Sequence, residues 1–202
     1  MGTHADDEKD DKPERNDQQR PESIIDQFSF KSRFVFVFGE ITQSIARATC
    51  ERLVALAQQS EAPIRVLISS PGGHVESGDA IHDIIRFITA PVTTIGTGWV
   101  ASAGTHIFLA ADKERRVCLP NTRFMIHQPT GGAGGPATDI AIQAREIIKT
   151  RERINQTIAQ QTGQTLERVS QDTDRDYWMS PEESLAYGLV GKIIKSAAEL
   201  PG

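Results

Sequence analysis

The residues IRVLISSPGG at positions 64–73 join an apolar run to a proline and two glycines. The run over 64–68 predicts a buried strand, and the proline and glycines predict the turn that ends it. The following residues place isoleucines on one helical face, at Ile81, Ile84, Ile85 and Ile88. Ser77 is the expected N-cap of this helix, and Pro91 opens a second strand over 92–95. This order of elements predicts the βαβ unit of an α/β fold.

The same alternation of strands and helices extends on both sides of this unit. The run FVFVF at 34–38 has no polar residue, which is expected of a strand buried on both faces. Further helices are predicted at 46–57, from about Ser102, and at 138–162, 165–174 and 181–187. Further strands are predicted at 115–118, 123–127 and 190–194. Repeated βαβ units imply a mainly parallel sheet with right-handed crossovers.

Length and composition fit a single globular domain that carries an extension. The chain has 202 residues, of which 38% are hydrophobic and 24% are charged, as is typical of globular proteins. Residues 1–22 are dense in charge and nearly free of aliphatic side chains, so they cannot bury enough apolar surface to offset the entropy of ordering. We therefore predict a flexible acidic polar tail over 1–22 and a single domain over 23–202.

Composition and motifs also exclude several classes of function. No apolar run reaches the ~18 residues of a membrane span, and the N-terminus resembles neither a signal peptide nor a transit peptide. We therefore predict a cytoplasmic protein without a membrane partner. The net charge of −5 argues against a nucleic-acid partner.

Two kinds of ligand site are also disfavoured. Cys50 and Cys118 have no CxxC partner or neighbouring histidines, so we expect small buried side chains and no metal site. The glycine-rich residues 131–135 lack the Lys-Ser/Thr of a phosphate-binding loop. No cofactor and no metal is predicted.

Four segments carry the residue types of a nucleophilic active site. Ser102 lies in GWVASAG at 98–104, where a strand leads into a helix, although Val100 excludes the G-x-S-x-G motif. His127 ends an apolar strand, and the acidic residues DTDRD occupy 172–176. The fourth segment is the proline–glycine turn, whose backbone N–H groups can approach a ligand closely.

Each of these features alone has an ordinary structural explanation: a helix N-cap, a core histidine, a solvated acidic surface or a strand-to-helix turn. Together they supply a nucleophile, a base, a carboxylate that fixes the imidazole tautomer, and N–H donors for an oxyanion hole. Of the other histidines, His4 in the tail and His82 on a helix fit this arrangement less well. His106 follows Ser102 by one helical turn, and His74 lacks a matching carboxylate.

In their order along the chain, these segments resemble the proteolytic subunit of the caseinolytic (Clp) protease family. The resemblance runs from about Phe34 to Ile194. It is carried by ISSPGG at 68–73, GWVASAG at 98–104, CLPNTRFMIHQP at 118–129, ATDIAIQAREI at 137–147 and DTDRDYWMS at 172–180.

The resemblance implies a role for each candidate residue. Ser102 becomes the nucleophile, His127 the general base and Asp176 the carboxylate that orients the imidazole, with Asp172 as the second choice. The oxyanion donors map to the backbone N–H groups of Gly73 and Ala103.

The resemblance also implies a fold, an assembly and partners. The fold is a crotonase-like spiral of βαβ units, in which a strand near 128–135 and the long helix after it form a protruding handle. Subunits assemble into heptameric rings stacked face to face around a chamber, where unfolded polypeptides are cleaved to short peptides. An AAA+ unfoldase feeds this chamber using ATP.

Two departures from the family bear on the partner. Arg65 and Leu67 stand where the family usually has tyrosines in the unfoldase-docking pocket, and Val117 replaces another aromatic residue, although Phe87 is retained. The polar tail over 1–22 replaces an apolar N-terminal loop. We therefore expect an atypical docking pocket.

Three other interpretations are open at this stage. A crotonase-type acyl-CoA hydratase or isomerase would share the fold but would need acidic catalytic residues on the early helices. A membrane-associated signal-peptide peptidase shares the serine motif but uses lysine as its base. A non-catalytic ring subunit would not need the serine, histidine and aspartate that this chain retains.

Overall fold

The structure is a computed structural model, and it describes residues 24–132 and 134–202. The flexible tail predicted over 1–22 lies outside these described residues. The first described element is the helix α1 (Ile24–Lys31), which leads into the first strand.

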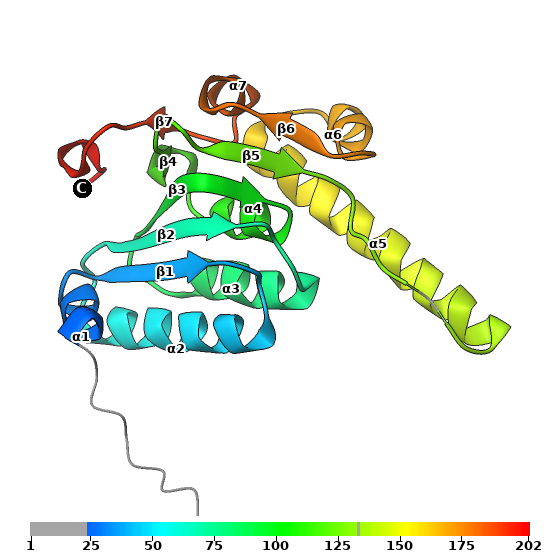
Figure 1. The fold of residues 1–202 in the computed structure, drawn as a ribbon, viewed down its shortest axis with the longest axis horizontal. Coiled ribbons are helices and arrows are strands. Elements are labelled where there is room, and N and C mark those ends of the chain that lie inside the picture. Colours follow the sequence, from blue (N-terminus) through cyan, green and yellow to red (C-terminus); the bar gives the residue numbers. More distant parts are fainter. Residues whose placement is uncertain (1–23, 133) are drawn as a thin grey trace, which may run out of the picture.

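Seven strands form one mixed sheet in the described part of the chain (Figure 1). Five parallel strands follow one another in the order β1 (Phe34–Phe38), β2 (Ile64–Ser70), β3 (Val92–Ala101), β4 (Arg116–Cys118) and β7 (Lys192–Ile193). The strand β5 (Arg123–Ile126) pairs in parallel with the end of β3, and β6 (Tyr177–Met179) pairs antiparallel with β5. The predicted α/β fold with a mainly parallel sheet is confirmed.

The strand β3 is longer than the strand predicted over 92–95, and two neighbours share it. Residues 94–96 pair with β4, whereas residues 99–101 pair with β5. Gly98 lies between these two stretches and has a φ of +60°. Glycine adopts a positive φ more readily than any other residue. β3 can therefore pair first with β4 and then with β5. Ser102 follows the end of β3, at the edge of the sheet.

Within the described residues, six further α-helices connect the strands or follow them: α2 (Gln43–Gln59), α3 (Val75–Phe87), α4 (Ala103–Phe108), α5 (Ala137–Thr162), α6 (Leu166–Asp172) and α7 (Pro181–Tyr187). α2 and α3 lie along one face of β1 and β2, and α5 extends away from the sheet as a long arm (Figure 1). The helices predicted at 138–162, 165–174 and 181–187 are confirmed to within a few residues.

Local sequence explains several helix ends. The Thr42 side chain accepts a hydrogen bond from the Ile45 amide at the start of α2, as an N-cap does. Ser180 and Glu183 form a capping box at the start of α7, and Gly188 ends this helix in the left-handed conformation, with φ 92°. These caps satisfy backbone groups that a helix terminus would otherwise leave unpaired.

The strand β1 differs from the prediction of a strand buried on both faces. Val35 and Val37 are buried, but Phe36 and Phe38 are 48% and 47% exposed. β1 lies at the end of the strand order, and the helices cover only one of its faces (Figure 1). An apolar run cannot distinguish a strand that is covered on both faces from one whose outer face is exposed.

Two other predictions are also wrong. α3 begins at Val75 with His74 in the N-cap position, whereas Ser77 is buried inside the first turn. The His74 carbonyl already accepts the first helical hydrogen bond, from the Gly78 amide, and the Ser77 hydroxyl is bonded to the His74 ring and not to a helix amide. The handle strand near 128–135 is not formed in the described residues, where β5 ends at Ile126. A strand requires a neighbouring strand to accept its hydrogen bonds, and this segment has no such neighbour within the described chain.

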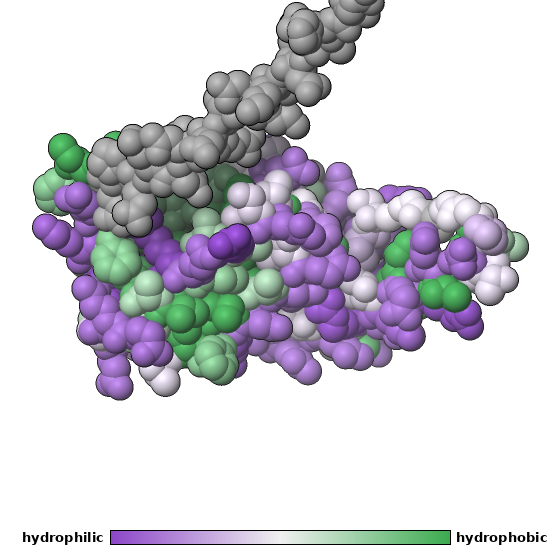
Figure 2. Space-filling view, turned by 90° about the horizontal axis from the view of Figure 1, so that it is seen from below, coloured by the Kyte–Doolittle hydropathy of each residue, from purple (hydrophilic) through white to green (hydrophobic). Residues whose placement is uncertain are grey.

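On the face that Figure 2 shows, hydrophilic side chains surround two groups of hydrophobic side chains, one on the body and one near the end of the projecting arm. On the arm, Ile140 and Ile142 of α5 are 40% and 46% exposed. None of the described helices is both long enough and apolar enough to cross a membrane.

Candidate active site

Ser102 lies at the junction of β3 and α4 in a strained backbone conformation. Its φ and ψ are 54° and −122°, a combination that non-glycine residues rarely adopt and that is found mainly at functional sites. The Ser102 amide donates to the Met125 carbonyl of β5 at 2.9 Å. The Thr105 hydroxyl stabilises the same junction, because it lies within hydrogen-bonding distance of the Val100 and Met125 carbonyls, at 2.8 and 2.9 Å.

Small residues make room for Ser102. A Cβ atom on Gly72, which has φ +97°, would lie 2.5 Å from the Ser102 Cβ atom. Gly78 of α3 faces Ala103, where an added Cβ would be 3.2 Å from the alanine Cβ atom. The glycines of the SPGG turn and of α3 therefore allow both segments to pass close to the serine.

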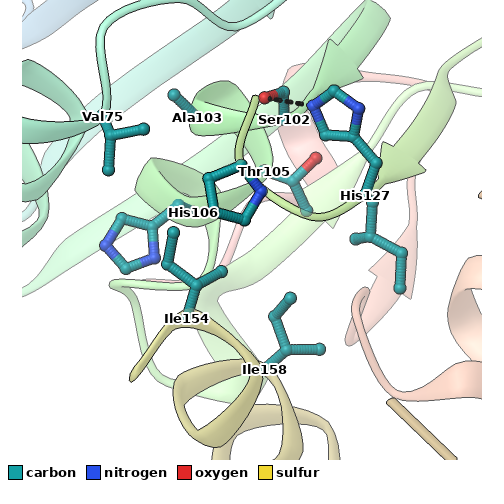
Figure 3. A pocket seen from close by; sticks show the side chains of 10 residues that line it. Val75, Ser102, Ala103, Thr105, His106, His127, Ile154 and Ile158 are labelled. Carbon is teal, nitrogen blue, oxygen red and sulfur yellow. Dashed lines mark hydrogen bonds between the residues drawn. The ribbon is translucent and has the colours of Figure 1, made fainter. Parts of the chain in front are cut away.

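His127 reaches Ser102 because their two strands are neighbours. β3 pairs with β5 from Trp99–Arg123 to Ala101–Met125, so the residues that follow each strand emerge side by side. The His127 Nε2 atom lies 2.8 Å from the Ser102 Oγ atom (Figure 3).

Asp176 is placed on the other side of His127 by the β5–β6 pairing. Ile126 is paired with Tyr177, so the residue after β5 lies opposite the residue before β6. The His127 Nδ1 atom is 3.0 Å from the Asp176 Oδ1 atom. Because an ionised carboxylate only accepts hydrogen bonds, this contact holds the proton on Nδ1 and turns the Nε2 lone pair toward the serine hydroxyl.

Further hydrogen bonds hold the acidic segment against β5. The Gln128 amide donates to the Thr173 carbonyl at 2.6 Å, and the Gln128 side-chain amide donates to the Asp174 carbonyl at 2.8 Å. Gln128 therefore anchors the backbone that carries Asp176.

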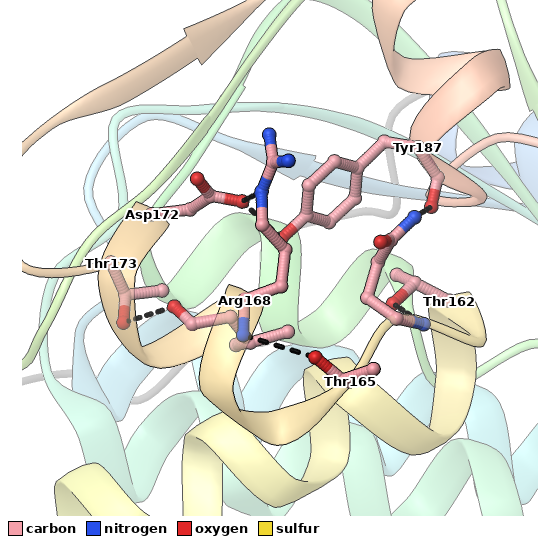
Figure 4. A network of polar contacts seen from close by, with 8 residues as sticks. Thr162, Thr165, Arg168, Asp172, Thr173 and Tyr187 are labelled. Carbon is pink, nitrogen blue, oxygen red and sulfur yellow. Dashed lines mark hydrogen bonds and ion pairs between the residues drawn. The ribbon is translucent and has the colours of Figure 1, made fainter.

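Asp172, the second choice for the orienting carboxylate, is engaged elsewhere. Its Oδ2 atom accepts from Arg168 Nε at 2.7 Å and from the Tyr187 hydroxyl at 3.0 Å (Figure 4). Burial, followed by the hydrogen bond to Asp172, raises the pKa of Tyr187 above its ordinary value. Asp176 is thus hydrogen-bonded to His127, whereas Asp172 connects α6 to the end of α7 through Arg168 and Tyr187.

The two backbone groups assigned to an oxyanion hole are available as donors. Ala103 is the first residue of α4, and Gly73 is the exposed end of the SPGG turn. Among the described residues, neither amide N–H meets a hydrogen-bond acceptor. Amides of this kind, near a helix N-terminus and beside a serine hydroxyl, can bind an oxyanion.

A pocket opens beside Ser102 and His127 (Figure 3). It is lined by Val75, Ser102, Ala103, Thr105, His106, Ile126, His127, Pro129, Ile154 and Ile158. Ile154 and Ile158 reach it from α5, so the long arm also forms part of the site (Figure 3). Sequence reasoning missed His106 as a pocket residue, although its spacing of one helical turn from Ser102 was the available signal.

No described cluster of three or more histidine, cysteine, aspartate or glutamate side chains could hold a metal ion. Cys118 is buried and Cys50 is partly buried, and both are free thiols. Burial raises the pKa of the Cys118 thiol to about 12, which disfavours the thiolate needed for metal binding or nucleophilic attack.

Comparison with known proteins identifies the family. A family model described as Clp protease matches residues 16–197. The ATP-dependent Clp protease proteolytic subunit 2 of Gluconobacter oxydans (strain 621H) is 60% identical over 182 residues, which cover 89% of this chain and 82% of the relative. The proteolytic subunit 3 of Rhizobium meliloti (strain 1021) is 58% identical over 171 residues, covering 85% and 88%.

Solved structures agree with the sequence relatives. The structure of ClpP1 from Listeria monocytogenes superimposes with a TM-score of 0.79 at 49% identity, covering 88% of this chain and 100% of that chain. Similarity of this extent, in sequence and in fold, assigns the family directly. The chain belongs to the Clp protease family of serine-type peptidases.

Proposed function

We propose that this chain is a serine endopeptidase, the proteolytic subunit of an ATP-dependent protease that cleaves unfolded polypeptides to short peptides through an acyl-enzyme. The observation that carries the proposal is the chain of hydrogen bonds from Asp176 through His127 to Ser102. It supplies a nucleophile, a base and an orienting carboxylate in bonding distance of one another.

In the first half of the reaction, the Ser102 Oγ atom attacks the peptide carbonyl while His127 Nε2 takes the hydroxyl proton. Asp176 keeps Nδ1 protonated and stabilises the imidazolium that forms. The amides of Gly73 and Ala103 donate to the carbonyl oxygen as it becomes negative. His127 then gives its proton to the leaving amine, which departs and leaves the acyl-enzyme.

In the second half, water replaces the amine. His127 takes a proton from the water as it attacks the acyl carbonyl, the C–O bond to Ser102 breaks, and the proton returns to the serine oxygen. A carboxylic acid product leaves and the enzyme is restored.

The alternative functions have less support. A crotonase-type hydratase would not need the Ser102–His127–Asp176 arrangement, and the relatives named above are proteolytic subunits. A lysine-dependent signal-peptide peptidase would need a lysine near Ser102, but none lines the pocket among the described residues. A non-catalytic ring subunit would not need Ser102 and His127 in bonding distance.

An activity-based label tests the main proposal. We expect a fluorophosphonate probe to modify Ser102, and Ser102→Ala to lower the turnover of a fluorogenic peptide by about 10³–10⁶-fold. Ser196→Ala, at an exposed serine near the C-terminus, is the matched control and should keep full activity. Labelling of another residue, or undiminished cleavage by Ser102→Ala, would rule out the assignment.

We further propose that the active form is a pair of stacked heptameric rings, joined through the arm that α5 forms. The exposed Ile140 and Ile142 offer apolar contacts to a second copy, and residues 130–132 of the glycine-rich segment offer backbone groups that are unpaired within the described chain. Analytical ultracentrifugation should detect a large assembly, and a monomer that retains full activity over a range of concentrations would refute this proposal.

The proposed docking pocket for an AAA+ unfoldase is less aromatic than in the family that this chain resembles. The Arg65 guanidinium lies over the Phe34 ring at 5.7 Å. Leu67 packs against the small apolar cluster that contains Val117, and Val117 is only 1% exposed. Phe87, in contrast, is 79% exposed. Loss of aromatic anchors should weaken apolar docking by ~1–3 kcal/mol for each anchor.

The rate at which an unfoldase and this chain together degrade a tagged folded substrate reports on this docking. We expect weak stimulation by a conventional Clp unfoldase, and partial recovery in the double variant Arg65→Tyr/Leu67→Tyr. The unmodified chain would contradict this expectation if it supported degradation as fast as a tyrosine-bearing relative does with the same unfoldase.

A further inference from the structure

His106 forms one end of the pocket beside Ser102. It lies one turn beyond Ser102 on α4 and is only 7% exposed. Figure 3 shows its imidazole at the end of the pocket opposite His127, with Ile154 and Ile158 of α5 along one side. A polar ring therefore closes a pocket whose walls are otherwise mostly apolar.

The His106 ring is held in a fixed orientation. Its Nε2 atom lies 2.9 Å from the Asp79 Oδ1 atom of α3. Asp79 in turn accepts two hydrogen bonds from the Arg153 guanidinium of α5, at 2.8 and 2.7 Å. The ring also stacks on His82 at a centroid distance of 4.4 Å, and the His82 Nδ1 atom is 2.9 Å from the His106 carbonyl.

The Asp79 contact decides which His106 nitrogen carries a proton. Burial disfavours the charged carboxylate, but hydrogen bonds from His106 and Arg153 outweigh it and hold the pKa of Asp79 well below its usual range. An ionised carboxylate only accepts, so His106 Nε2 carries the proton and a neutral His106 presents the Nδ1 lone pair as an acceptor.

That acceptor is buried and unused. The His106 Nδ1 atom has no hydrogen-bond partner among the described residues. Buried polar atoms are nearly always hydrogen-bonded in native proteins. An unpaired acceptor on a side chain that lines a pocket can accept a hydrogen bond from a donor group of a bound molecule.

The other residues of the pocket indicate what kind of side chain can carry this donor group. Ile126, Ile154 and Ile158 form apolar walls, which favour methylene groups and exclude a charge that lacks a partner. The side chain that enters therefore needs an apolar stem that ends in a neutral N–H donor. Among the genetically encoded side chains, only the carboxamides carry a neutral N–H donor at the end of an unbranched methylene stem, and glutamine has the longer stem.

Resting on the peptidase function proposed above, we infer that His106 makes this pocket a specificity site for glutamine on the acyl side of the scissile bond. The residue whose carbonyl Ser102 attacks must direct its side chain into the space beside the serine. Its amide N–H would donate to His106 Nδ1. Asp79 and Arg153 act as positioning residues that fix the His106 ring. Arg153 and the pocket residue Ile154 both belong to α5, so this helix forms part of the site.

Three fluorogenic peptides that differ only at this position test the inference: one with glutamine, one with methionine and one with glutamate. Methionine has a similar length but no donor, and ionised glutamate offers only acceptors to the His106 lone pair. We expect the unmodified protein to cleave the glutamine peptide with a kcat/KM about 3–10-fold above that of the methionine peptide, and the glutamate peptide slowest.

Variants assign the preference to His106. His106→Leu should reverse the ranking of glutamine and methionine, whereas Ser196→Ala, at a residue outside the pocket, should leave the ranking unchanged. An identical glutamine-to-methionine ratio in the unmodified protein and in His106→Leu would overturn the inference. If His106→Leu does not fold, the unmodified protein still decides: methionine or glutamate cleaved as fast as glutamine overturns it. Absence of any Ser102-dependent cleavage by the folded assembly would instead overturn the peptidase proposal.

Discussion

Two histidine–aspartate pairs flank Ser102, and they are nearly equal in length. The His127–Asp176 contact is 3.0 Å and the His106–Asp79 contact is 2.9 Å. In both pairs the aspartate accepts from the imidazole and fixes its tautomer. Only the surroundings differ, so the comparison shows which surroundings can make an imidazole a base.

The first difference is the partner of the second ring nitrogen. His127 presents Nε2 to the Ser102 hydroxyl, a group that can lose a proton. His106 lines the pocket, and its Nδ1 atom has no hydrogen-bond partner among the described residues. An imidazole can act as a general base only toward a proton within hydrogen-bond reach, so the first pair can serve proton transfer and the second can serve recognition.

The second difference is how many cations share the carboxylate. The Asp79 side chain is 19% exposed and is bonded by Arg153 as well as by His106. The Asp176 side chain is 63% exposed, and His127 is its only ion-pair partner in the described chain. A carboxylate already neutralised by an arginine adds little stabilisation to an imidazolium, whereas an unshared carboxylate can supply it when the proton arrives.

The largest expected effect of breaking a pair is on turnover at His127–Asp176. Asp176→Asn should lower kcat by about 10⁴-fold, because an amide can stabilise the wrong imidazole tautomer. Asp172→Asn is the matched control within the same acidic segment, and it should cost no more than about tenfold, since Asp172 contacts Arg168 and Tyr187 and not His127. Steady-state hydrolysis of one peptide by both variants gives the ranking, and the reverse ranking would transfer the role to Asp172.

The sequence could predict much of the site because its parts lie at the ends of strands. Apolar runs placed β2 and β3, and the residues after strands in a parallel sheet emerge at the same edge. Ser102 and His127 therefore emerged as candidates from their positions alone. The choice between Asp172 and Asp176, in contrast, rested on family resemblance, because it depends on the β5–β6 register and on a tyrosine that follows later in the chain.

Other features could not be read from the sequence because they depend on long-range packing. The His106 ring is oriented by Asp79 on α3, which is itself bonded by Arg153 on α5. No local sequence pattern links these three residues. The exposed face of β1 was missed for a related reason. Burial of Phe36 depends on what lies above the strand and not on the apolar run that contains it.

The second expected effect is on stability, and it falls on the other pair. Asp79→Asn should lower the free energy of unfolding by about 1–3 kcal/mol, because it removes the negative charge beside Arg153 and replaces one of the two acceptor oxygens that His106 and Arg153 share with an NH₂ donor. Asp176→Asn, at an exposed position, should change it by less than about 0.5 kcal/mol. Urea denaturation of both variants under the same assembly conditions makes the measurement. Equal losses would show that the two pairs do not divide activity and stability between them.

The smallest expected effect is the pH dependence of the Asp79 contribution. The pKa of Asp79 is lowered in the folded protein by hydrogen bonds that outweigh burial, whereas in the unfolded chain it is ~3.9. A group with a depressed folded pKa stabilises the protein above its unfolded pKa, and this contribution is lost as the pH falls toward the folded pKa. The stability difference between the unmodified protein and Asp79→Asn should therefore shrink by about 1 kcal/mol between pH 5 and pH 3. This range lies below that in which histidines ordinarily titrate, so it isolates the carboxyl group. A difference that stayed constant down to pH 3 would show that Asp79 carries no proton-linked stabilisation and that the His106 ring is held by packing alone.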